Sequence, residues 1–380
     1  MSVSYLDNAA TTPVRREVLE AMTPYLTSHF GNPSSHHTIG EQAAGALADA
    51  RIRVAAILGM RPTDVIFTSG ATEANNLALK GVAIAAQQRR GARHVVTTPI
   101  EHESVLGSVD YLTRIHGFDA TLVPVDTTGL VDPHAVAAAI RDDTAIVSVG
   151  YANNEIGTVQ DVAGLVAAVA GRVPLHLDAV QAAGWLPLAG LGADALSIAG
   201  HKIGAPKGIG ALGIRSRIPL EPVLHGGGQE RERRSGTENV AGAVGLARAL
   251  ELAEAERADA AERVSGMRDD LISGVLERVP NARLTGHPEH RLPGTASFTF
   301  SGVNGETVLL ELERRGIVTS SGSACAAGSE EASHVLLALG IDHDEARTAV
   351  RVTLGQGATG SVAPVVDAIE AAVAAVGSGV

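Results

Sequence analysis

Short β-branched runs alternate with alanine-rich stretches in the first half of the chain, and this alternation limits the fold more than any other feature. The runs lie at 65–68, 94–98, 121–125, 145–149, 174–177 and 195–199. Strands that alternate with helical segments are typical of a mostly parallel sheet with crossover helices. Ligands bind such sheets beyond the carboxyl ends of the strands. The sequence therefore predicts an α/β fold whose chemistry lies directly after these runs.

The length of the chain favours two domains. Its 380 residues exceed the roughly 250–300 at which a single hydrophobic core stops growing. A polar helical stretch over about 242–279, which reads as one helix or two, leaves the first unit, and a small α+β unit follows it. We expect a large domain at 15–246 and a small domain formed by 1–14 and 247–380.

Charge and cysteine content exclude several classes of function. A formal net charge of -12 argues against direct nucleic-acid binding, which depends on Lys and Arg at phosphates. The single cysteine cannot form an internal disulfide, and the first residues lack the features of a signal peptide. No run approaches the roughly 18 apolar residues of a membrane span. We therefore expect a cytoplasmic protein that does not bind a membrane.

Lys202 and Asp178 each follow an apolar strand. A lysine fixed at such a junction suits imine chemistry, because burial shifts its pKa readily; His-Lys alone would more simply be a surface turn. A carboxylate there needs a positively charged or hydrogen-bonding partner, and a protonated pyridine nitrogen would serve. A helix N-cap is the alternative for Asp178. The two residues together favour the functional interpretation.

The sequence SGATEA at 69–74 follows the first of these strands and begins a helix. Free backbone N–H groups and the Thr72 hydroxyl can bind a phosphate there, although a plain capping box would give the same pattern. The motif itself is neither GxxxxGK[ST] nor GxGxxG, and GxxxxGK[ST] does not occur elsewhere in the chain. The 14 histidines show no HExxH and no zinc spacing, so we expect no metal site.

Cys325 lies in a run of small residues, TSSGSACAAGS at 319–329. A lone cysteine is usually a buried apolar residue, but these neighbours offer no apolar packing. The run predicts a mobile loop that carries a functional thiol.

The order of the motifs resembles that of the class I cysteine desulfurases, over nearly the whole chain. The motifs are YLDNAATTP (5–13), SGATE (69–73), NNEIG (153–157), DAVQ (178–181), GHK (200–202), RSGT (234–237) and SSGSAC (320–325). The resemblance implies the fold of the fold-type-I pyridoxal 5'-phosphate (PLP) transferases. In that fold a large domain with a mostly parallel seven-stranded sheet is joined to a small α+β domain.

The resemblance also implies roles for single residues. Lys202 would hold the cofactor covalently, Asp178 would pair with its ring nitrogen, and His102 would stack on its ring. Further cofactor contacts implied in the same way are Ala71, Thr72, Asn154, Gln181 and His201, with Thr237 reaching the phosphate from the neighbouring subunit of a homodimer. The implied substrate contacts are Asn32, Asn154 and Arg351, whose guanidinium would bind the carboxylate.

In the implied reaction the Lys202 amine removes the Cα proton of L-cysteine, and His102 transfers a proton to or from the substrate thiol. The Cys325 thiolate then takes the sulfur as a persulfide and L-alanine leaves. A protein acceptor would receive the sulfur, such as an iron–sulfur scaffold or an enzyme that modifies tRNA or DNA. Ala199 stands where many relatives have a phosphate-binding serine, so we expect weaker retention of the phosphate.

Two other functions stay open at this level. A selenocysteine lyase or another fold-type-I PLP lyase would need no thiol at Cys325. A protein without catalytic activity could serve as a scaffold for sulfur-transfer partners, although Lys202, Asp178 and His102 argue against it.

Overall fold

The structure is a computed structural model that describes residues 3–322 and 331–377. Its large unit is built on a seven-stranded sheet with the order β2-β8-β7-β6-β5-β3-β4. The strands are β2 (Val65–Thr68), β3 (His94–Thr97), β4 (Asp119–Leu122), β5 (Thr144–Gly150), β6 (Leu175–Asp178), β7 (Ala195–Ala199) and β8 (Gly210–Ile214). β8 pairs antiparallel with β2 and β7, and the other pairs are parallel. The predicted mostly parallel sheet is confirmed.

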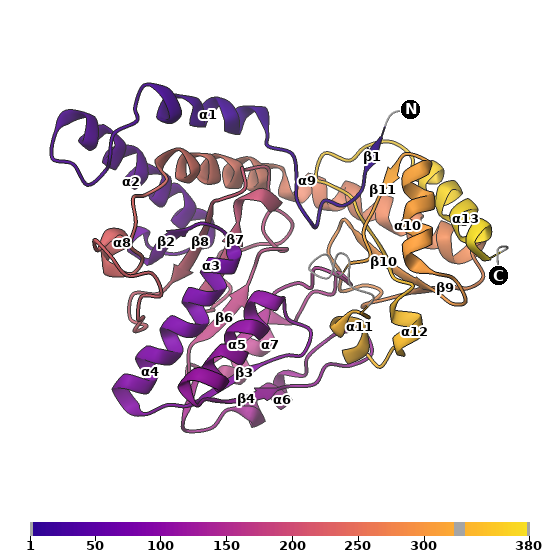
Figure 1. Cartoon of the computed structure of the whole chain (residues 1–380), viewed down its shortest axis with the longest axis horizontal. Helices are drawn as coiled ribbons and strands as arrows, with labels where there is room; N and C mark the ends of the chain where they lie inside the picture. Colours follow the sequence, from indigo (N-terminus) through magenta and orange to yellow (C-terminus); the bar gives the residue numbers. More distant parts are fainter. Residues whose placement is uncertain (1–2, 323–330, 378–380) are drawn as a thin grey trace.

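Helices cover the sheet and complete the large unit (Figure 1). They are α1 (Arg16–Thr27), α2 (Thr38–Leu58), α3 (Ala71–Asn76), α4 (Val82–Arg90), α5 (Glu103–His116), α6 (Pro133–Ala139), α7 (Val162–Val169) and the turn α8 (Gln229–Glu232). Shorter turns are η1 (Pro62–Asp64), the π-helical turn η2 (Leu77–Gly81) between α3 and α4, and η3 (Gly200–Lys202). Two aliphatic clusters fill the space between helices and sheet.

The small unit contains two further sheets. One has the order β12-β10-β9, and the other pairs β1 with β11 in parallel. Its elements are β1 (Ser4–Tyr5), β9 (Ala282–Leu284), β10 (Thr295–Phe300), α10 (Gly305–Arg314), β11 (Ile317–Val318), α11 (His334–Ala338), α12 (His343–Ala346), β12 (Val350–Thr353) and α13 (Ala363–Gly377). The first and last described residues both lie in this unit (Figure 1).

Helix α9 (Val240–Arg278) joins the two units as one continuous helix (Figure 1). Its residues as far as Ala253 pack in the core of the large unit, and those from Val264 pack in the core of the small unit. We therefore propose that the two units divide within this helix.

One predicted strand is placed differently. We expected a strand at 121–125, whereas β4 spans Asp119–Leu122. Pro124 follows Val123, and proline has no N–H to donate to a neighbouring strand, so the pairing stops before it. None of the helices among residues 3–322 and 331–377 is long and apolar enough to cross a bilayer.

Candidate active site

A cavity of about 900 Å³ opens at the carboxyl ends of the parallel strands. Loops that follow β2, β3, β5, β6 and β7 line it, as the alternating pattern predicted. Residues 7–13, which we call the N-terminal strap, pass between the two units, and Ala9, Ala10 and Thr11 form part of the cavity wall. Because these loops come from separate parts of the chain, the sheet brings the predicted residues together.

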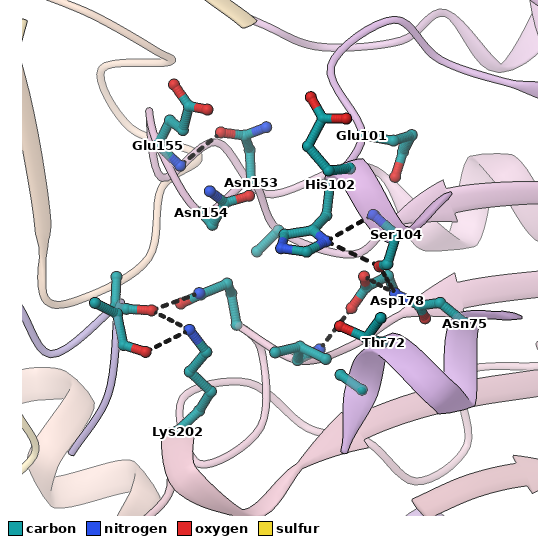
Figure 2. A pocket seen from close by; sticks show the side chains of 18 of the residues that line it. Thr72, Asn75, Glu101, His102, Ser104, Asn153, Asn154, Glu155, Asp178 and Lys202 are labelled. Atoms are coloured by element: carbon teal, nitrogen blue, oxygen red, sulfur yellow. Dashed lines mark hydrogen bonds between the residues drawn. The ribbon is translucent and has the colours of Figure 1, made fainter. Parts of the chain in front are cut away.

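Lys202 ends the turn η3, directly after β7. Its Nζ donates hydrogen bonds to the backbone oxygens of Ala9 and Ala10, the latter at 2.9 Å (Figure 2). Thr12 of the strap donates its hydroxyl to the backbone oxygen of His201 at 2.9 Å. The strap thus holds the amine at the edge of the cavity.

Asp178 ends β6 and is buried. Its Oδ1 accepts the backbone N–H of Val180 at 3.1 Å, and its Oδ2 accepts Asn75 Nδ2 at 2.7 Å (Figure 2). A carboxylate offers about four lone-pair positions, so Asp178 can accept a further donor from the cavity. Asn75, which our reading of the sequence missed, also donates to Ser104 Oγ at 2.9 Å. Its Oδ1 is buried and has no hydrogen-bond partner among the described residues.

His102 is the N-cap of α5. Its Nδ1 accepts the backbone N–H of Ser104 at 3.0 Å and lies 2.8 Å from Ser104 Oγ (Figure 2). Burial lowers the pKa of His102; the Asp178 carboxylate opposes this shift, and Lys202 adds to it. The ring is therefore neutral at pH 7, and it borders the cavity. A neutral imidazole can stack on a planar ring and can exchange a proton.

The residues of the predicted phosphate site line the same cavity. Gly70, with a φ of 153°, precedes α3, and Ala71 and Thr72 line the cavity beside His201 and Lys207. Burial, helped by Lys202 and Lys207, lowers the pKa of His201 to about 4. Lys207 supplies a cation here that we had not assigned.

A salt bridge fixes the loop at the phosphate site. Glu73 accepts the backbone N–H of Ser69 at 2.7 Å and pairs with Arg234 at 2.7 Å. The acid that suggested a capping box therefore positions this loop.

Arg351 lies on β12 and is only 1% exposed, yet it borders the cavity. Its Nη1 donates to the backbone oxygens of Asn154 at 2.7 Å and Gly322 at 3.2 Å, and its Nη2 pairs with Asp7 at 2.6 Å. Its Nε is buried and has no partner in the part of the chain that the structure describes. Gln181 also lines the cavity, where its Nε2 donates to the Ala9 oxygen at 3.0 Å.

Two predicted residues do not line this cavity. Asn32 is exposed in the loop between α1 and α2, where its Oδ1 accepts the backbone N–H of Ser34 at 2.9 Å. Thr237 is also exposed, and neither residue lines the cavity. Cys325 lies outside the described residues. Ser197 lies two residues before Ala199, and its Oγ forms a hydrogen bond with His176 Nε2 at 2.8 Å. This hydroxyl therefore does not replace the missing phosphate donor.

Residues on both sides of the segment 323–330 border the cavity, namely Gly322 and 331–334. Glu155 contacts both sides: it accepts the Ser333 hydroxyl at 2.5 Å, and a Cβ on Gly322 would lie 3.5 Å from its own Cβ. Burial raises the pKa of Glu155. Sequence reasoning had noted the NNEIG motif without assigning this contact.

The residues present fit PLP. The cavity is within the roughly 300–1,000 Å³ of typical cofactor sites. Its lining contains an acid with spare acceptor capacity, a neutral imidazole, and a helix start with a nearby cation. In the described part of the chain, no group of three or more His, Cys, Asp or Glu could hold a metal ion.

Comparison with known proteins defines the class. Residues 4–361 match the family described as aminotransferase class-V. The chain belongs to this family, whose cysteine desulfurase members depend on PLP.

Individual relatives narrow the class. The cysteine desulfurase IscS of Methanosarcina thermophila is 46% identical over 93% of this chain and 87% of its own length. A solved NifS-like protein has a TM-score of 0.88 at 37% identity and covers 100% of this chain and 99% of its own. A structure of SspA in complex with cysteine has a TM-score of 0.80 at 36% identity, over 92% and 98%. The resemblance to the class I cysteine desulfurases is confirmed.

Proposed function

We propose that this chain removes sulfur from L-cysteine, carries it as a persulfide on Cys325 and passes it to a protein acceptor. The observation that supports this most directly is the convergence of Lys202, Asp178 and His102 on one cavity. Gly322 and Glu331, which border the same cavity, stand on either side of the segment with Cys325. An SspA relative has been solved with cysteine bound.

Each residue then has a defined task. Bound PLP supplies an electron sink for the charge that develops at the substrate Cα. Lys202 removes the Cα proton, and Asp178 keeps the ring nitrogen of the cofactor protonated. His102, close to neutrality, exchanges a proton with the substrate thiol. These tasks require an uncharged amine at Lys202 when it accepts the proton, an ionised carboxylate and a neutral imidazole.

Arg351 binds the substrate carboxylate in this proposal. An arginine has five N–H donors, and the Asn154 oxygen, the Gly322 oxygen and Asp7 use three of them. The Nε–H and one Nη2–H are left. These two donors match a carboxylate in the bidentate manner.

Sulfur transfer follows at Cys325. Its thiolate forms a bond to the substrate sulfur, and the Cβ–S bond of the substrate breaks. The electron pair stays on the substrate, which takes up protons and leaves as L-alanine. The two sulfurs of the persulfide together lose two electrons and the substrate Cβ gains two, so the step needs no external oxidant.

We also propose a homodimer. Large apolar side chains on and between α1 and α2 are exposed, among them Leu26 at 60% and Phe30 at 69%. A second copy would bury this surface. It would also give exposed Thr237 a route to the phosphate of the neighbouring cavity. The acceptor would be an iron–sulfur scaffold protein or a sulfur-modification enzyme of tRNA or DNA.

The test measures alanine and protein-bound persulfide formed from L-cysteine by the holoenzyme. We expect both products from the wild type and from the control Lys80→Ala, because Lys80 lies on η2 and bonds Asn76 outside the cavity. Lys202→Ala and Cys325→Ala should form neither. Alanine formation that survives in Cys325→Ala would indicate a lyase, and a protein that never binds PLP would indicate a scaffold.

A further inference from the structure

Arg351 has a permanent anionic partner within the protein. Asp7 lies 2.6 Å from Nη2, with 17% of its side chain exposed against 1% for Arg351. The backbone around Asp7 is bound to β12: Asn8 Nδ2 donates to the Thr353 oxygen at 2.7 Å, and the Ala9 N–H donates to Thr353 Oγ1 at 2.9 Å. The Asp7 carboxylate is therefore held beside the guanidinium by the strap.

The pairing with Asp7 leaves N–H donors of Arg351 without a partner among the residues described. Asp7 uses one Nη2 hydrogen, and the buried Nε has no partner among the residues described. In the proposed role of Arg351, a substrate carboxylate binds the remaining Nε and Nη2 donors while Asp7 keeps its own contact. Two carboxylates would then flank one guanidinium, and like charges at this range repel each other.

We infer that Asp7 acts through Arg351 to lower the affinity of the site for α-carboxylates. This inference rests on the proposed role of Arg351. In the empty site Asp7 compensates a buried cation, whose lone burial would be costly. In the occupied site it repels the carboxylate of substrate and product alike, which lets L-alanine leave after each turnover.

The test uses ligands that cannot transfer sulfur. The dissociation constants of L-alanine and L-alaninamide, which lacks the carboxylate charge, are measured from the visible absorption of the holoenzyme. Asp7→Asn keeps the size of the side chain and an acceptor for Nη2 but removes the charge. We expect about tenfold tighter binding of L-alanine, unchanged binding of L-alaninamide and a lower KM for L-cysteine. The unfolding temperature of the ligand-free variant should fall, and L-alanine should restore it.

Two further variants separate the explanations. Asn8→Ala loosens the strap without changing its charge, and its affinity for L-alanine should stay within about twofold of wild type. Equal tightening in Asn8→Ala, or weaker or unchanged L-alanine binding in Asp7→Asn, would overturn the inference. Arg351→Met should lose the preference for L-alanine over L-alaninamide. If it keeps that preference, the carboxylate role of Arg351 fails as well; if only Asp7→Asn behaves unexpectedly, the inference alone fails.

Discussion

At the scale of single residues, burial sets the protonation state of the ring that borders the cavity. Loss of solvation destabilises the protonated ring of His102 more than the Asp178 carboxylate stabilises it. The pKa of His102 therefore lies below the ordinary value of 6.5. A neutral ring can accept a proton from the substrate thiol, whereas a protonated ring cannot. Activity should therefore fall on the acid side of neutrality.

We predict that His102→Gln lowers the rate of alanine formation by about 100-fold or more, in the range of lost general acid–base catalysis. The decline of the rate below pH 6.5 should also disappear, because glutamine does not titrate. Initial rates from pH 5 to 8, at saturating L-cysteine, test both effects. An acid limb that persists in the variant would assign it to another group.

The residues found from the sequence share one property. Lys202 and Asp178 follow strands, and the carboxyl ends of parallel strands meet at one edge, so their proximity was predictable. Asn75 and Asp7 were not assigned. Asn75 lies inside a helix, and the contact between Asp7 and Arg351 spans nearly the whole chain, so no local pattern indicates either role.

At the scale of elements, the turn α8 is unusual. Glu230, Arg231 and Glu232 have φ values of 49°, 60° and 64°, although none is glycine. Left-handed backbone costs such residues about 1–2 kcal/mol each. Glu230 offsets this cost through its buried pairing with Arg51 at 2.6 Å, whereas Glu232 is exposed and forms no ion pair within the described ranges.

Glu232→Gly should therefore stabilise the protein. Relief of the strain, less the added entropy of glycine in the unfolded chain, leaves a gain of roughly 0.5–1 kcal/mol. The same change at exposed Glu262 of the right-handed helix α9 should destabilise by about 1 kcal/mol. Urea unfolding gives the free energy of unfolding of both variants. A loss of stability in Glu232→Gly would contradict the prediction.

Helices and strands with a strong apolar pattern in the sequence were predictable, whereas elements with a weak apolar pattern were not. Apart from β4, the aliphatic strands lie at the expected places, and the polar stretch after residue 240 forms a helix. β8 (Gly210–Ile214) was not among the runs we recognised, because two of its five residues are glycine, which weakens a strand pattern.

At the scale of the whole molecule, a buried histidine links three central strands. The ring of His176 on β6 forms a hydrogen bond on each side. Its Nδ1 lies 2.9 Å from Ser148 Oγ of β5, and its Nε2 lies 2.8 Å from Ser197 Oγ of β7. Burial lowers its pKa from 6.5 to about 4. The unfolded chain therefore binds more protons than the folded one between these values, so stability falls as the pH drops from 6.5 to 4.

This group alone should remove roughly 2–3 kcal/mol from the free energy of unfolding across that window. His176→Gln should be less stable at pH 7.5, yet lose less stability on acidification than the wild type. Exposed His36→Gln is the matched control and should follow the wild-type pH dependence. Denaturant unfolding at pH 7.5, 5.5 and 4.5 measures the difference, and parallel curves for His176→Gln and wild type would refute it.

The strap has a consequence for how the protein is made. The ribosome synthesises the strap before any other part of the cavity wall, yet its partners Lys202 and Arg351 emerge much later. The large sheet can form while translation continues, since domains generally fold as units. The pairing of Asp7 with Arg351 must wait until β12 has left the exit tunnel. A nascent chain therefore cannot complete this cofactor pocket before Val350–Thr353 has emerged, which delays catalysis until both the large sheet and β12 have been made.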